Sequence, residues 1–230
     1  MQTIAILPIK SFGAAKQRLG ELLGGGSRQA LARAMFADVL GALRHVPALG
    51  EVAVVTGDRS AEWTARAERV LVLADPTEEG QSAAALIGVR HALSQGFDRA
   101  LLVPGDAPLL DPAELTALLE REPDDERGVV IVPDRHGIGT NALLLSPPDA
   151  FEPSFGPDSF ARHVAAAETA GIAPSVADLP SLALDVDTPD DLAEVAQRLD
   201  SRRGLAPQTR GALSQLERMG ALALPVPASA

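Results

Sequence analysis

Short runs of apolar residues alternate with longer amphipathic segments along most of this 230-residue chain. Six runs predict β-strands, and most of them are continuous apolar stretches, which is typical of strands buried on both faces of a sheet. These runs span residues 3–7, 52–55, 70–73, 100–103, 129–132 and 142–145.

Helical spacing and capping residues mark the segments between these strands. Ser27 precedes apolar residues that recur at helical spacing over residues 31–43, which predicts a helix that Ser27 caps. Asp111 and Thr188 each combine a capping side chain with a proline at the first helical position. The strand–helix alternation predicts an α/β fold, a three-layer sandwich with a mainly parallel sheet.

The pattern weakens after about residue 200. Residues 201–211 are polar and interrupted by glycine and proline, residues 212–219 suit one short helix, and the final residues show no periodicity. We therefore expect one domain over residues 1–200 and a mobile C-terminal tail over residues 201–230.

Composition narrows the classes of function. The sequence has no cysteine, which excludes a disulfide framework and a thiolate metal site. No basic region precedes the N-terminal apolar run, and no run approaches the ~20 residues of a membrane span, so we expect a cytoplasmic protein without a membrane partner. The net charge of −11 disfavours nucleic acid as a partner.

A loop directly after the first predicted strand carries the two lysines of the chain, Lys10 and Lys16. Together with Arg18 they can neutralise an anionic ligand, and the small residues around Gly13 let backbone N–H groups approach its oxygens. Ligands of parallel α/β folds gather at the carboxyl edge of the sheet, where this loop is expected. The alternative is a solvated loop without a ligand.

Three aspartates follow apolar segments in a way that suits a divalent cation. Asp106 comes after a predicted strand and next to Gly105, which lets a ligand come close. Asp185 and Asp187 alternate with an apolar residue and so share one face of an extended segment. Mg²⁺ prefers one or two carboxylates, with phosphate oxygens and water completing its octahedron. The alternatives are a helix cap for Asp106 and a solvated turn for the other two.

Two glycine-broken loops supply hydroxyl groups for a second anion. Thr140 precedes a predicted strand, and Gly156 and Ser159 precede a predicted helix. Their hydroxyls and backbone N–H groups can hold a second phosphate. His163, one turn into that helix, faces this pocket, the core or the surface. The sequence shows neither a Ser-His-Asp order nor zinc spacing, which fits phosphoryl chemistry in which the acceptor's own oxygen attacks.

With these motifs the chain resembles the 2-phospho-L-lactate guanylyltransferase family, including its bacterial phosphoenolpyruvate guanylyltransferases, which serve coenzyme F-420 biosynthesis. The resemblance covers about residues 3–199 and rests on four elements that are specific only together. They are P-x-K-x₅-K-x-R-L at Pro8–Leu19, P-G-D-x-P-L at Pro104–Leu109, G-T-N-A-L at Gly139–Leu143 with F-G-x-x-S at Phe155–Ser159, and L-D-x-D-T-P at Leu184–Pro189.

The resemblance implies a nucleotidyltransferase fold of the glycosyltransferase-A type, dependence on Mg²⁺, GTP as donor, and phosphoenolpyruvate or 2-phospho-L-lactate as acceptor. The Arg- and Ala-rich composition, typical of a GC-rich bacterium, favours phosphoenolpyruvate. The resemblance gives catalytic and metal-binding roles to Asp106, Asp185 and Asp187, contact with the GTP phosphates to Lys10, the catalytic Lys16 and Arg18, and the acceptor's phosphate to Thr140, Gly156 and Ser159.

One segment departs from the family pattern. Where the family often shows a Gly-Leu-Asn-like segment near the base, this chain has EEGQSAAALIG, and Gln81 and Ser82 are the candidates for that nucleotide contact. Residues 185–187 also satisfy the D-x-D pattern of sugar transferases. Another nucleotidyltransferase or a sugar transferase of the same fold is therefore one alternative, and a GTP-binding module without catalysis is another.

Overall fold

The computed structural model describes residues 1–121, 127–202 and 204–222. Within these residues its centre is a seven-stranded sheet in the order β3-β2-β1-β4-β6-β5-β7. The six predicted strands are confirmed, and a two-residue strand that no pattern indicated extends one edge. The strands are β1 Thr3–Ile9, β2 Glu51–Thr56, β3 Leu71–Ala74, β4 Arg99–Leu102, β5 Gly128–Pro133, β6 Thr140–Ser146 and β7 Ser175–Val176.

Strand β6 runs in the opposite direction to its neighbours. It pairs antiparallel with β4 and with β5, whereas the other strand pairs of the described sheet are parallel. The expectation of a mainly parallel sheet is thus confirmed. Because β6 is reversed, its first residues lie at the sheet edge where β1 and β4 end, which brings Thr140 close to the loops that follow those two strands.

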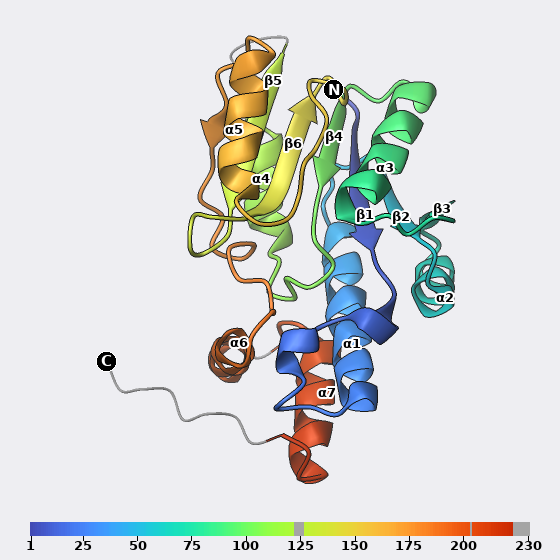
Figure 1. The fold of residues 1–230 in the computed structure, drawn as a ribbon, viewed down its shortest axis with the longest axis vertical. Helices are drawn as coiled ribbons and strands as arrows, with labels where there is room; N and C mark the ends of the chain where they lie inside the picture. The colour runs from blue at the N-terminus through green and yellow to red at the C-terminus, as the bar shows by residue number, and fades with distance from the viewer. Residues whose placement is uncertain (122–126, 203, 223–230) are drawn as a thin grey trace.

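Helices cover both faces of the sheet (Figure 1). Residues of α1, α2, α4, α6 and α7 belong to one buried cluster, and residues of α3 and α5 belong to the other, which confirms the three-layer sandwich. The helices are α1 Gly25–Leu43, α2 Arg59–Ala67, α3 Gln81–Gln95, α4 Pro112–Leu119, α5 Ser159–Thr169, α6 Pro189–Ser201 and α7 Pro207–Arg218, with 3₁₀ turns η1 Phe12–Ala14 and η2 Gln17–Leu19.

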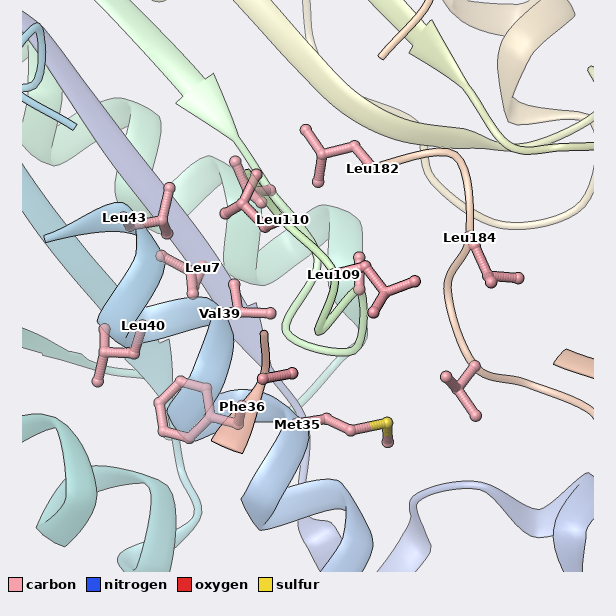
Figure 2. Close-up of a cluster of buried hydrophobic side chains, with 14 of the residues drawn as sticks. Leu7, Met35, Phe36, Val39, Leu40, Leu43, Leu109, Leu110, Leu182 and Leu184 are labelled. Carbon is pink, nitrogen blue, oxygen red and sulfur yellow. The ribbon is translucent and has the colours of Figure 1, made fainter. Parts of the chain in front are cut away.

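The larger core fixes the segments that carry the predicted aspartates. Met35 and Phe36 of α1 are fully buried in the same cluster as Leu7 of β1. Leu109 from the loop after β4 and Leu184 from the segment before α6 join that cluster (Figure 2). Burial of each such side chain contributes about 1.5–3 kcal/mol, so both segments are held firmly against the sheet.

The predicted helix caps are largely confirmed. The Asp111 side chain accepts a hydrogen bond from the Ala113 backbone N–H at the start of α4, and Thr188 forms a capping box with Asp191 at the start of α6. The cap expected at Ser27 is wrong, because α1 already begins at Gly25 and Ser27 lies in its first turn. The residue at the N-cap position is Gly24, so this helix begins without a capping side chain.

The segment predicted as a mobile C-terminal tail, residues 201–230, includes a helix in its described part. Helix α7 packs beside α1 and buries Leu213 and Leu216 in the larger core. The polar and glycine-rich context concealed this short apolar face, which only the surface of α1 completes. Residues 201 and 202 form the end and the C-cap of α6, whereas residue 203 and residues 223–230 lie outside the described residues. Each described helix is too short or too polar to cross a membrane.

Candidate active site

A cavity of about 570 Å³ opens at the carboxyl edge of the sheet. Its lining combines the loops after β1 and β4, the start of β6, the loop before α5 and the segment before α6. Nearly all of the residues singled out in the sequence meet in this lining. They are Lys10, Lys16, Arg18, Gln81, Asp106, Thr140, Gly156, Ser159, Asp185 and Asp187.

Ser82 does not belong to this lining. Its hydroxyl oxygen accepts a hydrogen bond from the Phe155 backbone N–H at 2.9 Å, which ties α3 to the loop before α5. The structure thus shows Ser82 in a contact that supports this loop, and its expected contact with the nucleotide stays a prediction. Gln81, the first residue of α3, does line the cavity.

The loops after β1 and β4 are packed tightly against each other. A Cβ atom at Gly105 would lie 2.3 Å from Cδ1 of Ile9, so the glycine that precedes Asp106 serves this close approach. The β1 loop is also anchored to α2, because the Phe12 backbone N–H donates to Asp58 Oδ2 at 3.0 Å. Both loops therefore present their charged residues from fixed positions.

Three carboxylates from two segments that are distant in the sequence meet at one point of the cavity. One carboxylate oxygen each from Asp106, Asp185 and Asp187 lies within 4.8 Å of the other two. The Val186 backbone N–H donates to the carbonyl oxygen of Asp106 at 3.1 Å, which joins the two segments. As expected for an extended segment, Val186 is fully buried while its two neighbours face the cavity. These hard oxygen donors fit a divalent cation.

Lys16 supplies a positive charge to these carboxylates. Its Nζ donates to Asp106 and, at 2.8 Å, to Asp187, and its side chain is only 6% exposed. Burial by itself lowers the pKa of Lys16, but the charges of the two aspartates outweigh burial and hold the pKa above its usual value. Lys16 also has a left-handed backbone conformation, with a φ of 56°, which is uncommon for residues other than glycine.

Crowding shifts the pKa values of two aspartates in opposite directions. Burial and the charges of Asp106 and Asp187 raise the pKa of Asp185 to about 6. Burial also acts upward on Asp187, yet its contact with Lys16 outweighs burial and lowers the pKa of Asp187. Asn141 Nδ2 donates to Asp185 Oδ1 at 3.2 Å and so orients this carboxylate. Perturbed carboxylates of this kind are typical of a functional site.

The hydroxyl residues form a second part of the lining. The Thr140 backbone N–H donates to Ser159 Oγ at 2.9 Å, and Thr140 Oγ1 lies 2.9 Å from Nδ1 of His163. Gly156 has a φ of 113°, which favours glycine, and a backbone turn at this position lets the loop reach the cavity. The residues expected to hold a second anion are thus assembled together, with His163 buried beside them.

Sequence reasoning missed three polar residues of the lining, namely Asp134, Asn141 and Asp158. Asp134 Oδ1 accepts hydrogen bonds from the backbone N–H groups of His136 and Ile138, which shapes the loop between β5 and β6. Asn141 lies within the G-T-N-A-L motif and Asp158 within the F-G-x-x-S motif, so their positions in these motifs could have indicated that they line the cavity. Asp134 has no comparable clue in the sequence.

Solved structures share this fold. A protein provisionally described as a nucleotide-diphospho-sugar transferase, from Desulfovibrio desulfuricans G20, has a TM-score of 0.74 at 19% identity and covers 95% of this chain and 97% of its own. A nucleotidyl transferase from a Methanothermobacter species has a TM-score of 0.65 at 21% identity, over 87% and 99% of the two chains. The chain therefore has the nucleotidyltransferase fold of the glycosyltransferase-A-like type, as expected.

Sequence comparison identifies the family. The model of the family described as guanylyl transferase CofC like matches residues 3–202. The phosphoenolpyruvate guanylyltransferase of Conexibacter woesei is 53% identical, over 95% of this chain and 98% of its own. The 2-phospho-L-lactate guanylyltransferase of Methanothermobacter thermautotrophicus is 35% identical, over 85% and 84%. The chain belongs to the CofC-like guanylyl transferase family, which confirms the resemblance drawn from the four motifs.

Proposed function

We propose that this enzyme transfers GMP from GTP to the phosphate of phosphoenolpyruvate and releases pyrophosphate, as a step of coenzyme F-420 biosynthesis. The observation that carries the proposal is the meeting of Lys16 with three aspartates beside a hydroxyl-lined pocket, in a member of the CofC-like family. The relative named for phosphoenolpyruvate is more similar than the one named for 2-phospho-L-lactate, which favours the former acceptor. A cytoplasmic location belongs to the same proposal.

The excess of negative charge in the cavity supports the proposal that the reaction depends on Mg²⁺. The lining holds five aspartates against three basic side chains, while both proposed substrates are anions. Asp106, Asp185 and Asp187 would hold the ion, whose charge when bound offsets that of the phosphate oxygens and orients them.

Different residues of the cavity would contact the two substrates. An acceptor phosphate oxygen attacks the α-phosphorus of GTP, so that one P–O bond forms while the bond to pyrophosphate breaks. A general base is not needed, because the acceptor phosphate is already ionised at neutral pH. The nucleotide phosphates would contact Lys10, Lys16 and Arg18, the base would lie near Gln81, and the acceptor would contact Thr140, Gly156 and Ser159.

A pyrophosphate-release assay tests the proposal. GTP, ATP, CTP and UTP are each combined with phosphoenolpyruvate, 2-phospho-L-lactate or 3-phosphoglycerate in the presence of Mg²⁺. We expect GTP with phosphoenolpyruvate to give the highest rate. Asp187→Ala should lower the rate on the order of 100-fold or more without unfolding the chain. Asp190→Ala, which removes an exposed aspartate three residues further on, is the matched control and should keep the wild-type rate.

Three outcomes contradict the proposal in different ways. Release of a nucleoside diphosphate from a nucleotide sugar, without pyrophosphate, indicates a sugar transferase. A melting temperature that rises with Mg-GTP, without turnover of any acceptor, indicates a binding module. A full rate of Asp187→Ala at limiting Mg²⁺ shows that the residues of the metal site are wrongly chosen.

A further inference from the structure

His163 is completely buried directly behind the hydroxyl-lined part of the cavity. Its ring packs against Phe155 and Phe151, with ring centroids 5.1 and 5.8 Å apart. Both ring nitrogens have a partner: Nδ1 lies 2.9 Å from Thr140 Oγ1, and Nε2 lies 2.9 Å from the backbone nitrogen of Ser154. The structure therefore connects this histidine to the cavity through one hydroxyl group.

The contact with Ser154 determines which ring nitrogen carries the proton. A backbone N–H can only donate, so Nε2 of His163 must accept and has no hydrogen. A neutral imidazole then carries its hydrogen on Nδ1. Burial, together with the charge of Arg162, lowers the pKa of His163 to about 4, in agreement with a neutral ring. Nδ1–H consequently donates to the hydroxyl oxygen of Thr140.

A hydroxyl that accepts from Nδ1 keeps its own hydrogen for another partner. Within the described part of the chain, Thr140 Oγ1 makes no other hydrogen bond, and Thr140 lines the cavity. Ser159 is in the same situation, because its Oγ accepts from the Thr140 backbone N–H while the residue also lines the cavity. Both hydroxyls are thus available as donors toward a ligand.

We infer that His163 is a positioning residue for the acceptor, which holds the Thr140 hydroxyl as a hydrogen-bond donor beside that of Ser159. The group that fits is an oxygen without a hydrogen of its own, as in an ionised phosphate or carboxylate. An ammonium or amide N–H group does not fit, because its hydrogens would face the hydrogens of the two donor hydroxyls. The identity of the acceptor rests on the proposed function, whereas the order of donors and acceptors is a property of the free protein.

Two replacements of His163 separate this role from simple packing. Asparagine places its Nδ2 near the position of Nδ1 and keeps a donor for Thr140, but it loses the acceptor for Ser154. Glutamine reaches the position of Nε2 and keeps an acceptor for Ser154, but it loses the donor for Thr140. Both replacements lose the ring contacts with Phe151 and Phe155, so each is the packing control of the other.

The pyrophosphate assay measures the effect on each substrate. In His163→Gln we expect the KM for phosphoenolpyruvate to rise about tenfold and the KM for GTP to change less than about twofold. In His163→Asn the KM for phosphoenolpyruvate should rise no more than about threefold. In a Thr140→Val background, which has no hydroxyl to orient, His163→Gln should add no further rise. Equal effects of the two His163 replacements, or a full additional rise in Thr140→Val, overturn the inference.

NMR of the protein labelled with ¹⁵N-histidine tests the inference without turnover. The sequence has four histidines, and the resonances missing in His163→Asn identify His163. We expect hydrogen on Nδ1 and none on Nε2 in the free protein at neutral pH, and hydrogen on Nε2 overturns the inference. If the wild-type chain releases no pyrophosphate with any acceptor, the proposed function fails, and the NMR result still decides the role of His163 toward Thr140.

Discussion

Lys16 would compete with a divalent cation for carboxylates of the candidate metal site. The ammonium group contacts Asp106 and Asp187, which are two of the three carboxylates that can hold a metal ion. A buried positive charge at this point reduces the attraction of the site for a second cation. The lysine and an ion at this site would therefore have to share these oxygens.

Replacement of Lys16 should separate metal binding from turnover. In the nucleotide-free protein, Lys16→Met should bind Mg²⁺ about threefold to tenfold more tightly than wild type, because one competing charge is removed. The turnover of this variant should fall, because the nucleotide phosphates lose their contact with the Lys16 ammonium group. Isothermal titration with MgCl₂ measures the affinity. Arg18→Met is the control, because the Arg18 side chain is 75% exposed and 3.9 Å from Asp187, so its charge is largely screened. Weaker Mg²⁺ binding in Lys16→Met contradicts the argument.

Asp185 makes the stability of the metal-free protein depend on pH. Its pKa is raised from 3.8 to about 6, so the folded protein binds this proton more tightly than the unfolded chain does. The resulting stabilisation is fully present below about pH 3.8 and is lost as the pH rises through about 6. At neutral pH the ionised Asp185 thus lowers the stability of the folded protein, and a cation bound at this carboxylate would offset that loss.

Asp185→Asn cannot ionise and should remove this cost. At neutral pH in EDTA its free energy of unfolding should exceed that of wild type by roughly 1–3 kcal/mol, since one pKa unit corresponds to about 1.4 kcal/mol. Near pH 4 the two proteins should be equally stable, because Asp185 is then protonated in the folded wild type. Urea unfolding at the two pH values gives the comparison. A variant that is less stable than wild type at neutral pH would contradict this explanation.

At the scale of elements, the N-terminus of α7 depends on one carboxylate of α1. The oxygens of Asp38 accept hydrogen bonds from the backbone N–H groups of Gln208 and Thr209 at 3.1 and 2.7 Å. The first N–H groups of a helix have no partner within the helix, and a negative charge near them is favourable. Asp38 thus caps α7 from a position about 170 residues earlier in the sequence.

Loss of this cap should loosen the contact between α7 and α1. Asp38→Ala should lower the free energy of unfolding by about 1–2 kcal/mol, measured by urea unfolding followed by circular dichroism. Asp38→Asn keeps one acceptor oxygen and should lose about half as much. Glu217→Ala, which changes an exposed residue of α7, serves as the control. Wild-type stability of Asp38→Ala would show that the apolar face of α7 alone holds the helix.

At the scale of the whole molecule, both the surface and the cavity are acidic. The net charge is −11, and the cavity lining has more aspartates than basic residues. GTP, the proposed donor, would therefore meet repulsion if it approached without a cation. We expect the Kd for GTP to rise at least about tenfold when EDTA replaces Mg²⁺, measured by calorimetry.

Added salt provides the control for this prediction. A rise in NaCl from about 0.05 to about 0.3 M should change the Kd for GTP by less than about threefold, because short contacts inside a cavity are screened less than exposed charges. Equal affinity for GTP with and without Mg²⁺ would contradict the proposed metal site.

The sequence by itself determined six of the seven described strands and most of the candidate residues. The six apolar runs, the caps at Asp111 and Thr188, and the alternation of Asp185 with Asp187 around a buried valine all appear in the structure as predicted. Each of these features depends on residues that are neighbours in the chain, so its physical cause is visible locally. The four motifs led to the family for the same reason, because each is a short run of residues.

Only the tertiary structure decided which of these residues meet. The reversed direction of β6 brings Thr140 to the edge that carries Asp106, and a parallel β6 would place it at the opposite edge. The contact of Lys16 with the aspartates and the packing of α7 on α1 likewise have no local signature. Strand direction and long-range contacts result from the packing of the whole chain, in which one arrangement buries the apolar faces of all elements together.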